Sequence, residues 1–63
     1  MKRNFRLSEV RQYNYTYIEG PWPLAVGTRI VYPPEHLWQS LGRSRLWTVV
    51  TMDEESDLIT LQD

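Results

Sequence analysis

The chain lacks cysteine and long apolar runs, and each absence excludes a class of structure. Without cysteine, a domain of 63 residues has neither a disulfide framework nor a thiolate zinc site to stabilise it. No stretch approaches the roughly 20 apolar residues of a membrane span. No apolar run of ~7–15 residues follows the basic residues near the amino terminus, so no secretory signal is expected. The sequence therefore predicts a soluble, cytoplasmic protein.

A strong excess of one charge is also lacking. The formal net charge is −1 and the sequence pI is about 5.7, so composition gives no general electrostatic argument for nucleic-acid binding. The two ends of the chain nevertheless differ in charge. The first eleven residues contain Lys2, Arg3, Arg6 and Arg11, and the last eleven contain Asp53, Glu54, Glu55, Asp57 and Asp63. We interpret these ends as a solvated arm and a solvated turn; a basic contact arm or complementarity between the ends is the alternative.

Aromatic residues, in contrast, are abundant: the chain has three Trp, four Tyr and one Phe. Each buries roughly 150–250 Å² in a core, and so short a chain has room for only one small core. Trp47 lies in the strongest strand-forming run of the chain, rich in β-branched and aromatic residues. We therefore expect Trp47 to be a core residue.

Alternation of side chains predicts four strands, near residues 12–18, 28–32, 45–52 and 58–62. The third is expected to be the central strand, because both of its faces carry large apolar groups. A polar link of residues 53–57 joins the last two strands. So short a link predicts an antiparallel hairpin, since a parallel crossover needs a dozen or more residues.

The segments outside these strands are predicted from single residues. Residues 1–11 lack clean alternation and are interpreted as a basic arm, with Ser8 as the candidate cap of a short helical turn. Residues 12–63 then form one small β domain. Proline before and glycine after residues 35–41 favour a helical turn there, with an irregular loop as the alternative. Gly27 is expected to take a positive φ as the chain enters its strand.

Residues 27–32, 46–50 and 58–61, joined by a loop and a charged turn, resemble the strand order of SH3-like small β-barrels. The resemblance covers roughly residues 24–61 and implies a mostly-β fold: an open barrel or strongly bent antiparallel sheet of about four to five strands. The group includes chromatin-reader, ribosome-associated and phage or prophage accessory proteins. Its ligands range from proline-rich peptides to RNA, so the resemblance implies no single function.

No catalytic or metal-binding pattern is present. The single histidine, His36, neighbours Glu35, but adjacent residues do not share a face of a helix or strand, so no triad is indicated. No serine or threonine has the glycine context of a nucleophile elbow. The acidic run 53–57 has no glycine for a calcium loop and is interpreted as a solvated hairpin tip. We expect no enzyme activity, no metal and no cofactor.

The strongest functional signal is the placement of aromatic residues in loops and strands. Trp22 lies between two prolines, and Trp38 lies in a proline-flanked loop. Trp, Tyr and Arg dominate binding hot spots, and neighbouring prolines reduce the entropy lost on ordering. The predicted partner-binding residues are Tyr13, Tyr15, Tyr17, Trp22, Trp38, Arg43 and Arg45. The three tyrosines are expected on one face of the first strand.

These residues favour a non-catalytic protein-interaction or regulatory module that binds a protein partner, of the accessory kind that phages and bacteria encode. In a first alternative, single-stranded nucleic acid stacks on the same aromatics while arginines contact phosphate; the acidic pI argues against it. In a second, the tyrosine strand or the carboxy-terminal strand pairs with a second copy of the chain to form a homodimer.

Overall fold

The computed structural model describes residues 1–34 and 44–63. Within these residues it contains one antiparallel sheet of five strands and one short helix, which confirms the mostly-β fold. In chain order the elements are β1 (Lys2–Arg6), α1 (Leu7–Tyr13), β2 (Thr16–Glu19), β3 (Arg29–Tyr32), β4 (Arg45–Asp53) and β5 (Leu58–Gln62). The helical turn expected near residues 35–41 lies outside the described part of the chain.

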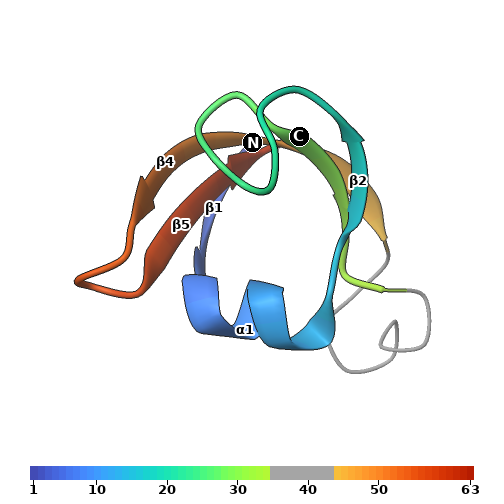
Figure 1. Cartoon of the computed structure of the whole chain (residues 1–63). Coiled ribbons are helices and arrows are strands. Elements are labelled where there is room, and N and C mark those ends of the chain that lie inside the picture. The colour runs from blue at the N-terminus through green and yellow to red at the C-terminus, as the bar shows by residue number, and fades with distance from the viewer. Residues whose placement is uncertain (35–43) are drawn as a thin grey trace.

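The sheet is strongly bent and open. Its strand order is β1-β5-β4-β3-β2, so β4 is the central strand, as predicted. Figure 1 shows the sheet curved into an arch, with α1 lying across the open side between β1 and β2. Register shifts occur in the β2–β3 and β4–β5 pairings. Such bulges bend a strand and increase its twist, which accounts for part of the curvature.

Three of the four predicted strands are confirmed to within one residue at each end: they are β3, β4 and β5. The acidic link between the last two forms the turn of an antiparallel hairpin, also as predicted. Because β5 lies between β1 and β4, however, the carboxy-terminal strand is not a sheet edge. Of the two strands considered for pairing with a second copy, only β2 has a free edge in the described sheet.

The amino-terminal segment requires a correction. Residues 1–11 do not form a solvated arm, because β1 pairs with β5 along all five of its residues and α1 follows directly. Two helix residues, Leu7 and Val10, are at most 1% exposed. The sequence signal was weak for two reasons. The side chains of an edge strand are mostly polar here, and a helix of seven residues is too short for a clear periodicity.

The expected tyrosine strand over residues 12–18 is also wrong in its first half. Tyr13 is the last residue of α1, and Asn14 then reverses the chain with a φ of 69°. Alternation alone cannot separate a strand from a helix end that is followed by a turn, and the packing of Tyr13 against the core overrides its strand propensity. Tyr13, Tyr15 and Tyr17 therefore do not share one strand face.

The core lies between α1 and the inner side of the sheet (Figure 1). Its buried apolar residues are Leu7, Val10, Leu24, Ile30, Tyr32, Trp47, Val49, Ile59 and Leu61. Trp47 is 2% exposed, as expected, and its indole Nε1–H donates to the carbonyl oxygen of Tyr32 at 2.8 Å. Phe5 of β1 packs edge-on against both rings, with centroids 5.5 and 5.7 Å away. An edge strand therefore completes the aromatic centre of the core.

Candidate functional site

A surface pocket of about 350 Å³ lies beside the end of α1 and the strand β2. Its lining residues are Arg11 from α1, Asn14 and Tyr15 from the link, Tyr17 from β2, and Trp22 from the loop that follows. Three of the seven predicted partner-binding residues, Tyr15, Tyr17 and Trp22, meet there. The structure thus brings part of the predicted site together, although not on a single strand face.

The backbone conformation of Asn14 brings the end of α1 and the start of β2 to the same pocket. Asparagine tolerates a positive φ better than most other non-glycine residues, and here it ends α1 and turns the chain toward β2. Arg11, in the last turn of the helix, and Tyr15, just before the strand, consequently line the same cavity. The hydroxyl of Tyr15 also donates to the carbonyl oxygen of Pro23 at 3.3 Å. This bond links the α1–β2 connection to the loop that carries the tryptophan.

Trp22 and Tyr17 form a fixed aromatic corner of the pocket. Trp22 is 70% exposed. Its ring meets that of Tyr17 edge to face, with centroids 4.9 Å apart and planes at 90°. The Tyr17 hydroxyl donates to the carbonyl oxygen of Gly20 at 2.6 Å, so the far end of that ring is held as well. Contacts within the chain therefore maintain two perpendicular ring surfaces at the protein surface.

The buried residue Thr28 fastens the loop behind Trp22. Its hydroxyl donates to the carbonyl oxygen of Pro21 at 2.5 Å and accepts from the amide of Ala25 at 3.0 Å. Both loop groups would otherwise lose hydrogen bonds to water on burial, which is costly. Thr28 thus acts in support of the site, and its hydroxyl both donates and accepts a hydrogen bond within the loop.

Two glycines allow this loop to fold closely onto the sheet. Gly20 has a φ of 100°, and a Cβ there would lie 2.8 Å from the carbonyl oxygen of Gly27. Gly27 has a φ of 96°, as expected, and its amide donates to the carbonyl oxygen of Val49 in β4 at 2.9 Å. Only a residue without a side chain fits at position 20, which is also the position that accepts the hydrogen bond from Tyr17.

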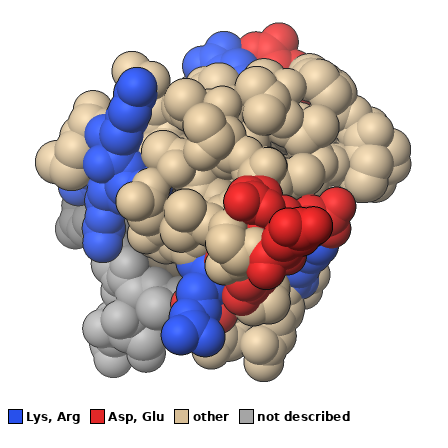
Figure 2. Space-filling view, turned by 90° about the vertical axis from the view of Figure 1, so that its left-hand side faces the viewer, with Lys and Arg blue, Asp and Glu red and all other residues tan. Residues whose placement is uncertain are grey.

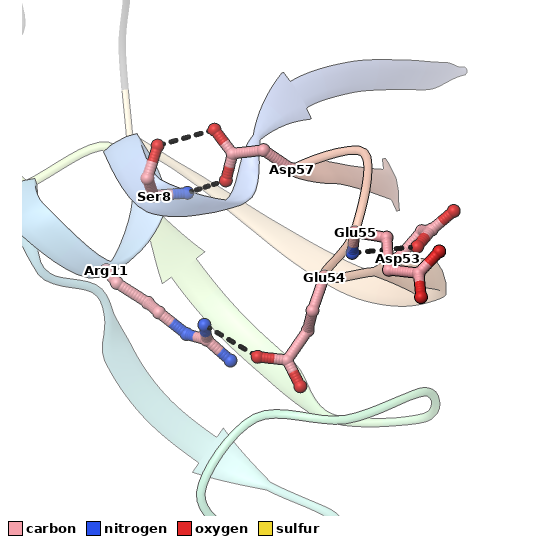
Figure 3. A network of polar contacts seen from close by, with 6 residues as sticks. All are labelled: Ser8, Arg11, Asp53, Glu54, Glu55 and Asp57. Atoms are coloured by element: carbon pink, nitrogen blue, oxygen red, sulfur yellow. Dashed lines mark hydrogen bonds and ion pairs between the residues drawn. The ribbon is translucent and has the colours of Figure 1, made fainter.

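Arg11 is the charged residue of the pocket lining. Its Nη1 donates to Oε1 of Glu54 in the β4–β5 turn at 3.1 Å (Figure 3). Both side chains are substantially exposed, at 48% and 69%, and an exposed pair of this kind contributes about 0–1 kcal/mol. Sequence reasoning missed Arg11 because it placed this residue in a detached arm, and its partner lies 43 positions along the chain.

The sequence predicted that the acidic turn is a solvated hairpin tip. The structure shows that this turn also contacts α1. The amide and hydroxyl of Ser8 donate to the two carboxylate oxygens of Asp57 at 2.7 and 2.6 Å (Figure 3). These hydrogen bonds, from the hydroxyl first and then the amide, lower the pKa of Asp57, and the nearby Arg6 and Arg11 lower it further. The turn therefore binds the first turn of α1. Ser8 supports the helix by donating to Asp57 and is not itself the N-cap, a position that Arg6 occupies.

Figure 2 shows the consequence for the surface. Most of the acidic side chains visible on this face lie in one cluster, a separate acidic group lies at the upper edge of the view, and lysine or arginine side chains lie on both sides of the cluster. Complementarity between the two ends of the chain, one of the alternatives from the sequence, is thus realised within the molecule. The amino-terminal ammonium group and Arg45 both contact Asp63, at 2.6 and 3.2 Å. The first of these contacts lowers the pKa of Asp63 most.

The remaining predicted site residues lie elsewhere. Tyr13 is half-buried and packs against the core, and Arg45 pairs with Asp63 instead of lining the pocket. Trp38 and Arg43 lie outside the described residues, as does His36. Of the predicted set, the pocket therefore keeps Tyr15, Tyr17 and Trp22 and adds Arg11 and Asn14.

The chemical groups of the pocket are suited to binding. They are aromatic ring surfaces, a carboxamide and a guanidinium group. In residues 1–34 and 44–63, no group of three or more His, Cys, Asp or Glu side chains is arranged to hold a metal ion. In the same ranges, no helix has both the length and the apolar character needed to cross a membrane.

Outside the pocket, burial of the Tyr32 side chain in the core raises the pKa of its hydroxyl, and the nearby Glu9 and Tyr13 raise this pKa further.

Comparisons of the chain with protein-family models, with curated proteins and with solved structures found no match.

Proposed function

We propose that this chain is a non-catalytic binding module that takes up a segment of a protein partner at the pocket. The observation that carries the proposal is the convergence of Tyr15, Tyr17, Trp22 and Arg11 on one surface cavity. Trp, Tyr and Arg are the residue types that contribute most at interface hot spots. The hydrogen bonds that hold both tyrosine hydroxyls reduce the conformational entropy that a partner must overcome.

The size of the pocket supports a short segment as its occupant. A volume of about 350 Å³ is at the lower end of the roughly 300–1,000 Å³ typical of ligand sites. A site of this size accepts one or two side chains, which is how an anchor residue of a peptide segment or loop is held. This occupant also explains why Trp22 is 70% exposed. Covering the exposed indole with an apolar side chain of the partner removes apolar surface from water, which favours binding.

Single-stranded nucleic acid is the less favoured occupant. Arg11 is the one cationic side chain among the described residues that line the pocket. The acidic turn next to the pocket repels a chain of phosphates, whose binding depends on several cations acting together. A protein segment needs no such series of cations.

The test compares two exposed side chains of the same loop. Tagged wild-type chain, Trp22→Ala and Val26→Ala are used to recover partners from the native host's lysate, with and without nuclease. Val26 is 59% exposed and does not line the pocket, so its truncation is the matched control. We expect the wild type and Val26→Ala to recover the same protein under both treatments, and Trp22→Ala to recover at least about tenfold less.

Thermal melts decide whether the loss belongs to the site. Trp22→Ala should melt close to the wild type, because a side chain that is mostly exposed contributes little to the core. Equal recovery by Trp22→Ala and the wild type would contradict the proposal. If nuclease treatment abolishes recovery of the partner, the aromatic and arginine side chains are instead assigned to nucleic-acid binding.

A further inference from the structure

Arg11 has two contacts at once: it lines the aromatic pocket and it pairs with Glu54 of the acidic turn. From this arrangement we infer that the partner segment carries an aspartate or glutamate side chain, which Arg11 binds in place of Glu54. The inference rests on the proposed function and specifies the chemistry of the partner. In it, Glu54 is an internal competitor for the binding site.

The existing ion pair can be exchanged at low cost. The pair is formed by one contact of 3.1 Å, between Nη1 and Oε1, and both side chains are about half exposed or more. A guanidinium group has five N–H donors, so further donors are free of this contact and available to a second carboxylate. Exposed pairs of this type add little to stability, because solvent screens them and both side chains lose entropy.

A carboxylate from a bound segment would have a better environment than Glu54 has. An apolar side chain of the segment, placed on the Trp22–Tyr17 corner, removes water from the cavity that Arg11 lines. Charge-assisted hydrogen bonds strengthen when water is excluded around them. Arg11 therefore favours a ligand that supplies both groups together: an apolar or aromatic side chain for the corner and a carboxylate for the guanidinium group.

The charge of the surroundings limits how much negative charge the ligand carries. The turn next to Arg11 contains Asp53, Glu54, Glu55 and Asp57 (Figure 3). Four carboxylates on one short turn give this part of the surface a negative charge. One carboxylate is tolerated there when it directly contacts Arg11, but a series of phosphates is repelled. The structure therefore favours a protein segment with one acidic side chain over a polyanion.

The experiment uses the full-length chain and an array of random heptapeptides with amidated carboxyl ends, so that only side chains supply carboxylates. Bound peptides should be enriched in sequences that contain an aspartate or glutamate together with an apolar or aromatic residue. The strongest binder and its amide version, with Asn or Gln in place of the acid, are then compared by titration calorimetry. We expect the acidic peptide to bind about tenfold more tightly.

Three variants separate the competition from general electrostatics. Arg11→Gln should remove the preference for the acidic peptide. Glu54→Gln should bind the acidic peptide about two- to fivefold more tightly than the wild type, because the competitor of Arg11 is gone. Glu55→Gln removes the same charge from the same turn, but the ion pair with Arg11 belongs to Glu54 alone among the described acidic residues, so it should bind as the wild type does.

Each other outcome overturns the inference. Equal binding of the acidic and amide peptides, or equal gains from Glu54→Gln and Glu55→Gln, would reject the role of Arg11 and Glu54. If these results are obtained but Trp22→Ala still abolishes peptide binding, the proposed function remains supported although the inference fails. If no heptapeptide binds, or if an oligothymidylate binds more tightly than the best peptide, both the inference and the protein-binding function are rejected.

Discussion

At the residue scale, Trp22 and Trp47 have opposite environments, with exposed fractions of 70% and 2%. Trp47 lies in the core between the central strand and α1, with Phe5 of β1 packed against its ring, and its N–H has a buried acceptor. Trp22 lies in a loop between two prolines, where its main aromatic contact is the edge-to-face packing with Tyr17. The same side chain therefore serves the core in one place and the surface pocket in the other.

Substitution of Trp47 tests its part in the core. Trp47→Ala should lower the free energy of unfolding by about 3–5 kcal/mol, because a large cavity opens among Phe5, Tyr32 and the sheet. Trp47→Phe keeps an aromatic ring but leaves the carbonyl oxygen of Tyr32 without its donor, so its effect should be smaller, about 1–3 kcal/mol. Urea unfolding followed by circular dichroism measures both. Equal values for the two variants would show that cavity formation is not the dominant effect.

At the element scale, α1 depends on the hairpin turn for its attachment. A helix of seven residues is too short to be stable alone in water. Its apolar face packs on the core, and its first turn is bound by the turn through the Ser8 bonds to Asp57 and a bond from the Leu7 amide to the Asp57 carbonyl oxygen at 3.1 Å. The same turn holds Arg11 through Glu54. The β4–β5 turn thus positions both ends of the helix and, with it, one wall of the pocket.

The attachment of the helix predicts a dependence of stability on pH. The pKa of Asp57 is lowered in the folded chain from its ordinary value of 3.8, so the ionised carboxylate favours the fold. This stabilisation is complete above that value and is lost as the pH falls through the lower pKa of the folded state. Asp63, whose pKa is also lowered, acts in the same window. The free energy of unfolding should therefore decrease as the solution is acidified below pH 3.8.

Asp57→Asn isolates this contribution. Asparagine tolerates the φ of 56° at this position, so the variant removes the charge with little change to the backbone. We expect lower stability than the wild type at neutral pH and a shallower decline on acidification. Ser8→Ala, which removes one of the two hydrogen bonds, should give a smaller change in the same direction. Parallel pH profiles for Asp57→Asn and the wild type would refute this account of the turn.

At the scale of the whole molecule, the two terminal strands, β1 and β5, stand at the opposite end of the strand order from β2, the strand that lines the pocket. β1 pairs with β5, and the termini lie close together at the top of the arch (Figure 1). The amide of Asp63 donates to the carbonyl oxygen of Met1 at 3.2 Å, and the terminal ammonium group contacts the Asp63 side chain. The first strand is therefore a structural part of a domain with a small core.

Removal of residues 1–6 tests this conclusion directly. The deletion uncovers β5 and takes away Phe5, whose ring contacts Tyr32 and Trp47. Its cost should exceed that of a single large-to-small core substitution, about 2–5 kcal/mol, so we expect loss of a cooperative thermal melt. The double variant Lys2→Gln with Arg6→Gln keeps the strand without two of its charges and should melt cooperatively. A deletion variant that melts like the wild type would restore the interpretation of this segment as an arm.

Local sequence patterns were sufficient for the middle and end of the fold. β-branched and aromatic runs predicted β3, β4 and β5 nearly to the residue, and the short polar link fixed their last pairing as a hairpin. Trp47 was recognisable as core from its strand, and Trp22 as a site candidate from its prolines. These features depend on residues that are close in the sequence, so composition and spacing contain the information.

The sequence by itself therefore determined that the chain is small, mostly β and rich in aromatic residues, and its local patterns predicted a strongly bent sheet. Only the tertiary structure decided that the first eleven residues form a strand and most of a helix, and that Arg11 belongs to the pocket. The physical reason is the distance along the chain: Ser8 meets Asp57 across 49 positions, and Arg11 meets Glu54 across 43. Contacts between residues so far apart leave no periodic pattern in either segment. The two partners of each contact come together only when the sheet has folded.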